Sequence, residues 1–425
     1  MALSKDISLN ELVEGTYRLY EKGERMTHLG ICPMSEELIK APIELAMQYG
    51  FPVLFVASRN QVSEDKGGGY VMGLDQESFL GKIESMEEFC RVTLGLKRPY
   101  LRFVSVDHCG PWYKEREKSL AKEEAIESVK RTLTACISAG YAGIHVDCSF
   151  EPPPHVRIDE EEVIRLTADL VEFAEEERVR LGKPSLSYEI GTEESAGAGV
   201  SAARFRESID KMLAEFRRRR LPDLAFVVGK TGAKVKMLEN VGGFDYTAAS
   251  SLPRVAKEYR MGFKEHNADY LSTPILSLHP VYGITCANVG PDFAAAQTGA
   301  LLELADLEEK SLGKGSSNLY NIMSNAVLQK APFKKWLREA EKWSADELRS
   351  MPAELRAVTL TAGHYVYYDG KVREAILRLY SNLKKHAIVN EPEGYVVSAV
   401  KKAIMRYVDA FNLRGSTAKI LKILG

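Results

Sequence analysis

The sequence lacks most of the features that assign a chain to a specialised class of protein. Its 425 residues contain no apolar run near the roughly 18 residues that a membrane-spanning helix needs, and no apolar signal segment follows Met1. The 57 basic and 59 acidic residues leave a net charge of −2. This balance gives no electrostatic reason to expect nucleic acid or an anionic membrane as a partner. We therefore expect a cytoplasmic protein.

Cysteine is scarce and scattered. The 6 cysteines form no CxxC pair, which is not typical of a disulfide scaffold or a zinc knuckle. There is no internal repeat, and no GxGxxG follows the first apolar run, so nothing favours an open dinucleotide-binding sheet. With 45% hydrophobic residues, the chain is long enough to bury a large core.

What the sequence does contain is a regular alternation of short apolar runs and charged segments of helical period. Helical stretches such as 123–140 end in glycine, a typical C-cap. Eight strands alternating with helices predict a parallel (β/α)₈ TIM barrel over residues 1–330, followed by a C-terminal helical extension over residues 331–425. The eight runs lie at 28–32, 53–58, 101–106, 143–147, 186–191, 224–229, 261–266 and 283–289.

Polar residues gather where these runs end. In a barrel the carboxyl ends of all strands lie at one face, which is the catalytic face. The polar residues at the ends of the runs are Asp107, His108, Asp147, Glu193, His266 and Asn288.

Asp107 and His108 are the most suggestive of these pairs. A metal-bound histidine beside a carboxylate base is a suitable catalytic arrangement, but an aspartate that caps the next helix with a histidine packed behind it fits equally well. His145 and Asp147 share a face of the fourth strand, where they form either a structural hydrogen bond or a catalytic support. Glu189 lies within the fifth run.

These segments together resemble the tagatose-bisphosphate aldolase family, in the branch described as its non-catalytic subunit. The similar pieces occur in order over about residues 26–310, so the resemblance covers the whole expected barrel. They are HLGIC, RNQV, GGGY, VDHCGP, AGYAGIHVDCS, LSYEIGTE, EHNADY and NVGP.

The same pieces are similar, more loosely, to the catalytic class II ketose-bisphosphate aldolases. By that resemblance Asp107 becomes the acid–base residue, and His108 and His266 become ligands of a divalent metal such as zinc, manganese or magnesium. Glu189 is then a further ligand, and Glu193 and Asp147 are catalytic. Substrate contacts are expected at Arg59, Asn60, Gln61, His145, Lys230, Asn288 and Gly290.

One departure from the aldolases concerns the sixth strand, which supplies them with a further metal histidine. Here it reads 226-FVVGKTGAK-234, without histidine, so a metal would be held by His108, His266 and a glutamate. Lys230 resembles the placement of a Schiff-base lysine, but binding a phosphate or lying in solvent fits it better. Glycines 67–69, with Arg59 and Lys66 nearby, suggest either another phosphate site or a lid.

The favoured hypothesis is a metal-dependent enzyme that epimerises a ketose or ketose phosphate at C4 by retro-aldol or enediolate chemistry. An aldolase is the nearer alternative. The other alternative is a non-catalytic partner that stabilises a separate tagatose-1,6-bisphosphate aldolase subunit. Barrels with helical additions often pair, so we also expect a homo-oligomer.

Overall fold

A closed barrel of eight parallel strands forms the centre of the protein. The computed structural model describes residues 7–150, 159–191, 201–337 and 343–425. The barrel strands follow one another around the ring in chain order, and β1 closes it by pairing with β10. They are β1 (His28–Ile31), β2 (Val53–Ser58), β3 (Arg102–Asp107), β4 (Gly143–Val146), β5 (Ser187–Ile190), β6 (Leu224–Gly229), β9 (Gly262–Glu265) and β10 (Cys286–Val289).

Helices cover the outside of this ring, which explains why the strands are apolar along nearly their whole length. The helices between successive strands are α2 (Glu37–Tyr49), α3 (Gln76–Val92), α4 (Lys122–Ala139), α5 (Glu160–Arg180), α6 (Ala202–Arg219) and α7 (Tyr246–Glu258), with the short α8 (Thr273–Leu276) and α9 (Leu278–Tyr282) before β10. A small antiparallel hairpin, β7 (Val235–Lys236) and β8 (Glu239–Asn240), follows β6. The expected (β/α)₈ barrel is thus confirmed.

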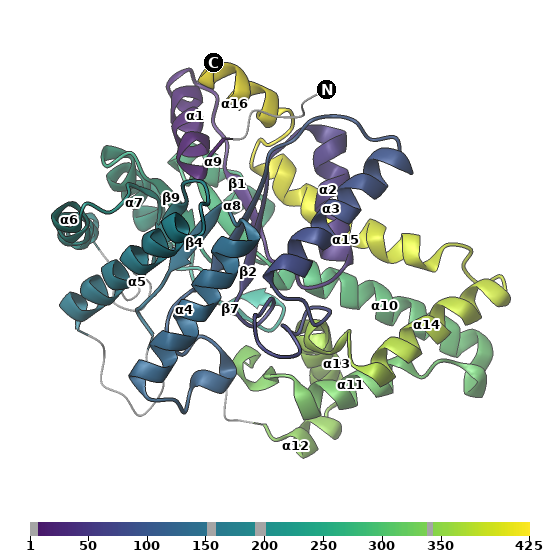
Figure 1. The fold of residues 1–425 in the computed structure, drawn as a ribbon. Helices are drawn as coiled ribbons and strands as arrows, with labels where there is room; N and C mark the ends of the chain where they lie inside the picture. Colours follow the sequence, from purple (N-terminus) through teal and green to yellow (C-terminus); the bar gives the residue numbers. More distant parts are fainter. Residues whose placement is uncertain (1–6, 151–158, 192–200, 338–342) are drawn as a thin grey trace.

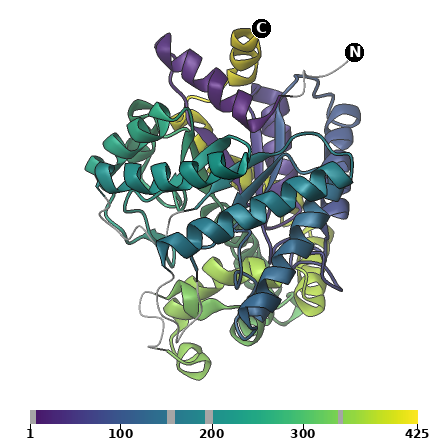
Figure 2. The ribbon, with the colours of Figure 1, turned by 60° about the vertical axis from the view of Figure 1, so that its left-hand side comes forward.

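Two helices from opposite ends of the chain close the amino-terminal end of the barrel. Helix α1 (Leu9–Glu21) lies beside α16 (Ser416–Leu424), as Figures 1 and 2 both show. The Tyr17 hydroxyl of α1 donates to the Met261 carbonyl just before β9, at 2.6 Å. The helices between residues 319 and 385 lie at the other end of the barrel (Figure 1).

The extension has a hydrophobic core of its own. That core begins at Ala300, within the long α10 (Pro291–Leu312), and runs to Val396, within α15 (Pro392–Ala410). Residues from Val400 onward join the barrel core instead. The core of the extension thus also takes in residues before 331, and the expected boundary after residue 330 stays a prediction. The other elements of the extension are α11 (Leu319–Lys330), the 3₁₀ turn η3 (Phe333–Trp336), α12 (Ala345–Arg349), α13 (Pro352–Ala362), η4 (Gly363–Val366) and α14 (Gly370–Lys385).

All six cysteines are free thiols, which agrees with the expected absence of a disulfide scaffold. Among the described residues, no helix combines the length and the apolar character that crossing a membrane requires.

Candidate active site

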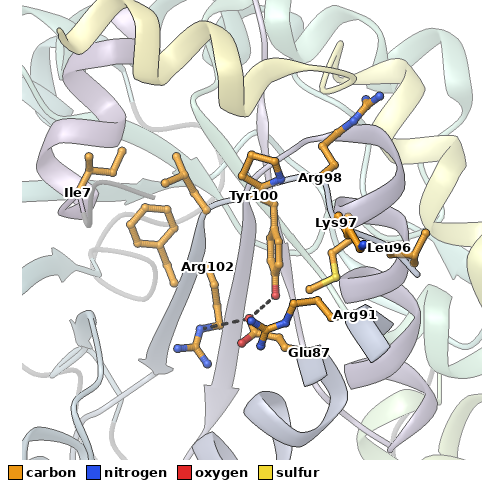
Figure 3. A pocket seen from close by; sticks show the side chains of 12 residues that line it. Ile7, Glu87, Arg91, Leu96, Lys97, Arg98, Tyr100 and Arg102 are labelled. Carbon is orange, nitrogen blue, oxygen red and sulfur yellow. Dashed lines mark hydrogen bonds and ion pairs between the residues drawn. The ribbon is translucent and has the colours of Figure 1, made fainter. Parts of the chain in front are cut away.

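The cavity at the carboxyl ends of the strands is the candidate site. It has a volume of about 430 Å³, and Asp107, His108, His266 and Asn288 line its floor. A second cavity, of about 250 Å³, lies at the amino end of β3 and is drawn in Figure 3. Because catalysis in (β/α)₈ barrels takes place at the carboxyl face, the cavity at the strand ends is the candidate active site.

A left-handed residue ends β3 and turns two adjacent side chains toward the same cavity. His108 has φ of 48°, which is uncommon for a residue with a β-carbon and is often found at functional sites. Asp107 is the last residue of the strand, and both side chains line the cavity. His266 is followed by another left-handed residue, Asn267, with φ of 65°.

Three imidazoles and one carboxylate converge at the floor of this cavity. His145 Nδ1 lies 2.8 Å from Asp107 Oδ1, and His266 Nε2 lies 3.9 Å from the same oxygen. His108 Nε2 is 3.9 Å from Asp107 Oδ2. Four residues each place one possible metal-ligand atom within 4.8 Å of the other three: Asp107, His108, His145 and His266.

The third histidine of the cluster comes from β4. Strand β6 carries no histidine, and β4 is two places away from it around the barrel, with β5 between them. His145, for which a substrate contact was expected, has a buried ring that packs against the rings of both His108 and His266, with centroid distances of 5.1 and 5.2 Å. The cluster thus contains a histidine from strand four and none from strand six.

Asp147 lies behind His108 and fixes its orientation. Its Oδ2 is 2.8 Å from His108 Nδ1 and accepts a 2.5 Å hydrogen bond from the Tyr113 hydroxyl, while Oδ1 accepts from Ser149. The Tyr113 ring stacks on the His108 ring at 5.0 Å. A β-carbon on Gly110 would meet the Asp147 carbonyl oxygen at 1.5 Å. Glycine at this position therefore lets the loop after β3 pass close to the end of β4.

Glu189 forms an ion pair with Lys264 inside the barrel. Its Oε2 is 2.5 Å from Lys264 Nζ, and its Oε1 is 3.4 Å from His266 Nε2. The Lys264 ammonium also lies over the Phe226 ring, at 5.4 Å. Glu189 thus adjoins the histidine cluster, but its nearest cation is a buried lysine, and it is not part of the four-residue group.

The electrostatics of the floor follow from these contacts. Burial alone would raise the pKa of Glu189, but Lys264 and the neighbouring histidines lower it to about 2. Burial alone would lower the pKa of His108, but Asp107 and Asp147 raise it to about 9. The pKa of Asp107 is well below its usual range because His108, His266 and His145 outweigh its burial. Asp107 is therefore a carboxylate at neutral pH.

Four of the expected substrate-contact residues line the cavity, namely Asn60, Gln61, Asn288 and Gly290. Asn288 Nδ2 is 3.4 Å from Asp107 Oδ2, and its Oδ1 is buried with no hydrogen-bond partner among the described residues. Lys230 is half-buried and does not line the cavity. Glu193 lies outside the described residues.

Arg59 and the glycine-rich loop do not form the expected anion site. Arg59 is buried and pairs with Glu117 through two hydrogen bonds of 2.6 and 2.8 Å, and its remaining N–H groups donate to Gly110 O and the hydroxyls of Ser128 and Thr132. All five of its N–H groups are thereby used within the protein. In the loop, Gly68 N and Gly69 N donate to backbone carbonyls. This corrects the expectation that Arg59 contacts substrate.

Sequence reasoning missed Lys264 and Tyr113, although both left a signal. Lys264 stands two residues before His266 in 261-MGFKEH-266, so period-two alternation places the two side chains on one face of the strand. Tyr113 follows Asp-His-Cys-Gly-Pro-Trp and is carried back to the site by the loop.

Known relatives place this barrel among enzymes of the epimerase or aldolase-like type. The chain belongs to the family described as D-tagatose-1,6-bisphosphate aldolase subunit GatZ/KbaZ-like, whose model matches residues 13–392. It is 28% identical over 414 residues to D-tagatose 6-phosphate 4-epimerase of Agrobacterium fabrum (strain C58), covering 89% of this chain and 93% of that protein.

Two solved structures share the fold. One, described as a probable tagatose 6 phosphate kinase from Sinorhizobium meliloti 1021, has a TM-score of 0.71 at 21% identity, with 90% of this chain and 100% of that chain covered. The other, fructuronate-tagaturonate epimerase UxaE from Cohnella laeviribosi, has a TM-score of 0.52 at 13% identity, with 91% and 81% covered. At these identities they support the fold alone.

Proposed function

We propose that this protein is a metal-dependent 4-epimerase of a ketose phosphate of the tagatose and fructose type. The observation that carries the proposal is the third histidine. With His145 beside His108 and His266, the barrel mouth has three imidazoles around one carboxylate, although the sixth strand has no histidine. The similarity to a D-tagatose 6-phosphate 4-epimerase supports the choice of substrate.

The donor set fits a divalent transition metal. Three imidazole nitrogens with a nearby carboxylate suit zinc better than magnesium, which prefers oxygen ligands. His108, His145 and His266 would hold the ion, leaving Asp107 for proton transfer. When bound, the ion supplies Lewis-acid polarisation of the carbonyl and hydroxyl oxygens of the sugar.

Asp107 moves the proton in this proposal. Its carboxylate accepts the proton of the C4 hydroxyl, the C4–O electrons form the aldehyde, and the electrons of the C3–C4 bond pass to an enediolate over C2 and C3. The aldehyde rotates, the bond re-forms on its other face, and Asp107 returns the proton. No electrons are gained or lost overall. His145 and Asn288 hold the Asp107 carboxylate in place.

The test is to incubate the purified protein with D-tagatose 6-phosphate, with and without EDTA, and to separate the products by chromatography. We expect D-fructose 6-phosphate, no turnover with EDTA, and recovery when zinc or manganese is added back. Metal content should fall in His145→Ala and stay unchanged in His386→Ala, an exposed histidine of the extension. Triose products in place of the epimer would make the protein an aldolase.

The second candidate is the non-catalytic partner of a separate aldolase subunit, which the description of the family favours. A purified wild type that is folded, free of metal and inactive on D-tagatose 6-phosphate would support this role and contradict the epimerase. The buried charges of Asp107, Glu189 and Lys264 argue against a purely non-catalytic role. Burying charged groups costs free energy, and a barrel that only stabilises a partner does not require them.

A further inference from the structure

One part of the cavity wall, apart from the histidine cluster, belongs to the helical extension. Five lining residues come from this part of the chain, outside the eight strands: Lys330, Pro332, Lys335, Trp336 and Tyr365. The catalytic floor and this wall are therefore built by two different hydrophobic cores.

A hairpin of the barrel fastens this wall above the strand ends. Lys236 Nζ, on β7, donates to the Lys335 carbonyl at 2.5 Å, and Met237 N donates to the Trp336 carbonyl at 2.8 Å. From the other side, the Tyr70 ring packs 4.9 Å from the Tyr365 ring. The η3 turn that carries Lys335 is thus held in position by contacts with the barrel loops.

The cations at this wall differ in whether a carboxylate neutralises them. Lys330 forms an ion pair with Asp369. Lys335 has no carboxylate within ion-pair distance among the described residues, and its ammonium lies over the faces of Trp336 and Tyr365, 4.8 and 5.2 Å from the ring centroids. Aromatic faces hold an ammonium without neutralising its charge.

Neighbouring lysines add to the positive field around Lys335. Burial lowers the pKa of Lys236, and the positive charges of Lys234 and Lys335 lower it further. A dianion placed among them would relieve this repulsion. The other expected anion ligands, Arg59 and the loop amides of Gly68 and Gly69, already have partners inside the protein.

We propose that Lys335 binds the phosphate of the ketose phosphate, with Trp336 and Tyr365 fixing its ammonium group, while the reacting carbons lie against the histidine cluster. The helical extension then acts as the part of the protein that selects phosphorylated sugars. The proposal rests on the proposed function for the identity of the sugar, but the phosphate site itself can be tested without turnover.

The test is calorimetric titration of the full-length protein with inorganic phosphate and, separately, with D-tagatose 6-phosphate, in wild type, Lys335→Met and Lys334→Met. Lys334 is the matched control, because it is exposed, adjacent in sequence and absent from the cavity lining. We expect Lys335→Met to weaken the binding of both ligands about 10- to 100-fold, the usual range for one charge-assisted contact. Lys334→Met should leave both affinities unchanged. Lys335→Arg should retain most of the affinity.

Equal affinity in Lys335→Met and Lys334→Met, or no phosphate binding by wild type, would overturn the phosphate site. Kinetics separate this outcome from failure of the proposed function. In an active enzyme, Lys335→Met should raise KM for D-tagatose 6-phosphate at least tenfold with a smaller change in kcat. If wild type binds phosphate through Lys335 yet produces no epimer, the phosphate site is confirmed and the proposed epimerase activity is contradicted.

Discussion

The two ends of the barrel arrange their buried polar side chains differently. At the amino end each polar side chain contacts only one or two neighbours. His28 Nε2 lies 2.7 Å from Thr16 Oγ1, and beside the cavity of Figure 3 Glu87 accepts a hydrogen bond from Tyr100 and lies 3.6 Å from Arg102. At the carboxyl end the contacts are shared, since several groups crowd around one Asp107 carboxylate.

The difference shows in two histidines. Burial lowers the pKa of His28 to about 4, so it is neutral. His108 is also largely enclosed, which opposes its charge, but Asp107 and Asp147 raise its pKa to about 9. A neutral histidine with one hydrogen-bond partner, such as His28, contributes to stability. Several titratable groups that converge on one point, as around His108, form a site that can exchange protons or bind a cation.

The largest expected effect is on chemistry at the carboxyl end. Asp107→Asn removes the proposed proton acceptor while keeping a similar shape, so we expect kcat for D-tagatose 6-phosphate to fall about a thousandfold. Thermal unfolding should show a folded protein. A loss of tenfold or less in a folded variant would exclude Asp107 as the residue that moves the proton.

Next in size is the buried ion pair beside the cluster. Lys264→Met leaves Glu189 as an uncompensated buried carboxylate and should lower the free energy of unfolding by about 3–5 kcal/mol, measured by urea denaturation. The double variant Lys264→Met/Glu189→Met should recover most of that loss, because it removes both charges. If the double variant is no more stable than the single one, the cost lies in packing and not in charge.

A smaller effect depends on pH. Asp269 accepts hydrogen bonds from Gly290 N and Asp292 N, and burial raises its pKa to about 7. The folded state therefore binds a proton that the unfolded chain has lost above about pH 4, and this contribution to stability disappears as pH rises through 7. Between pH 5.5 and pH 8, wild type should lose about 2 kcal/mol of unfolding free energy relative to Asp269→Asn. If the unfolding free energies of wild type and Asp269→Asn change with pH in parallel, the raised pKa of Asp269 is wrong.

The smallest effect concerns the amino end. Thr16→Val keeps the shape of the side chain but removes the partner of His28, so the free energy of unfolding should fall by about 1 kcal/mol. We expect kcat to stay unchanged, because Thr16 lies at the end of the barrel away from the cluster. A changed kcat would mean that the two ends are coupled, which would weaken the contrast between them.

Much of the fold could be predicted from local pattern. The run at 53–58 matches β2 residue for residue, and the run at 101–106 lies within one residue of β3. The run at 283–289 began too early, because Gly283 ends α9 and the strand starts at Cys286. Strand and helix periods are short-range properties of the backbone, which is why the sequence shows them directly.

The side chains that come together in the cavity and in its buried ion pairs could not be predicted from these local strand and helix periods. His145 joins the histidine cluster only because the closed barrel places β4 near both β3 and β9, and Arg59 pairs with Glu117, 58 residues further along the chain. Lys335 reaches the cavity because the extension folds over the strand ends. Local sterics and apolar periodicity determine the elements, whereas the partner of a buried charge depends on which distant elements the closed barrel and its second core bring together.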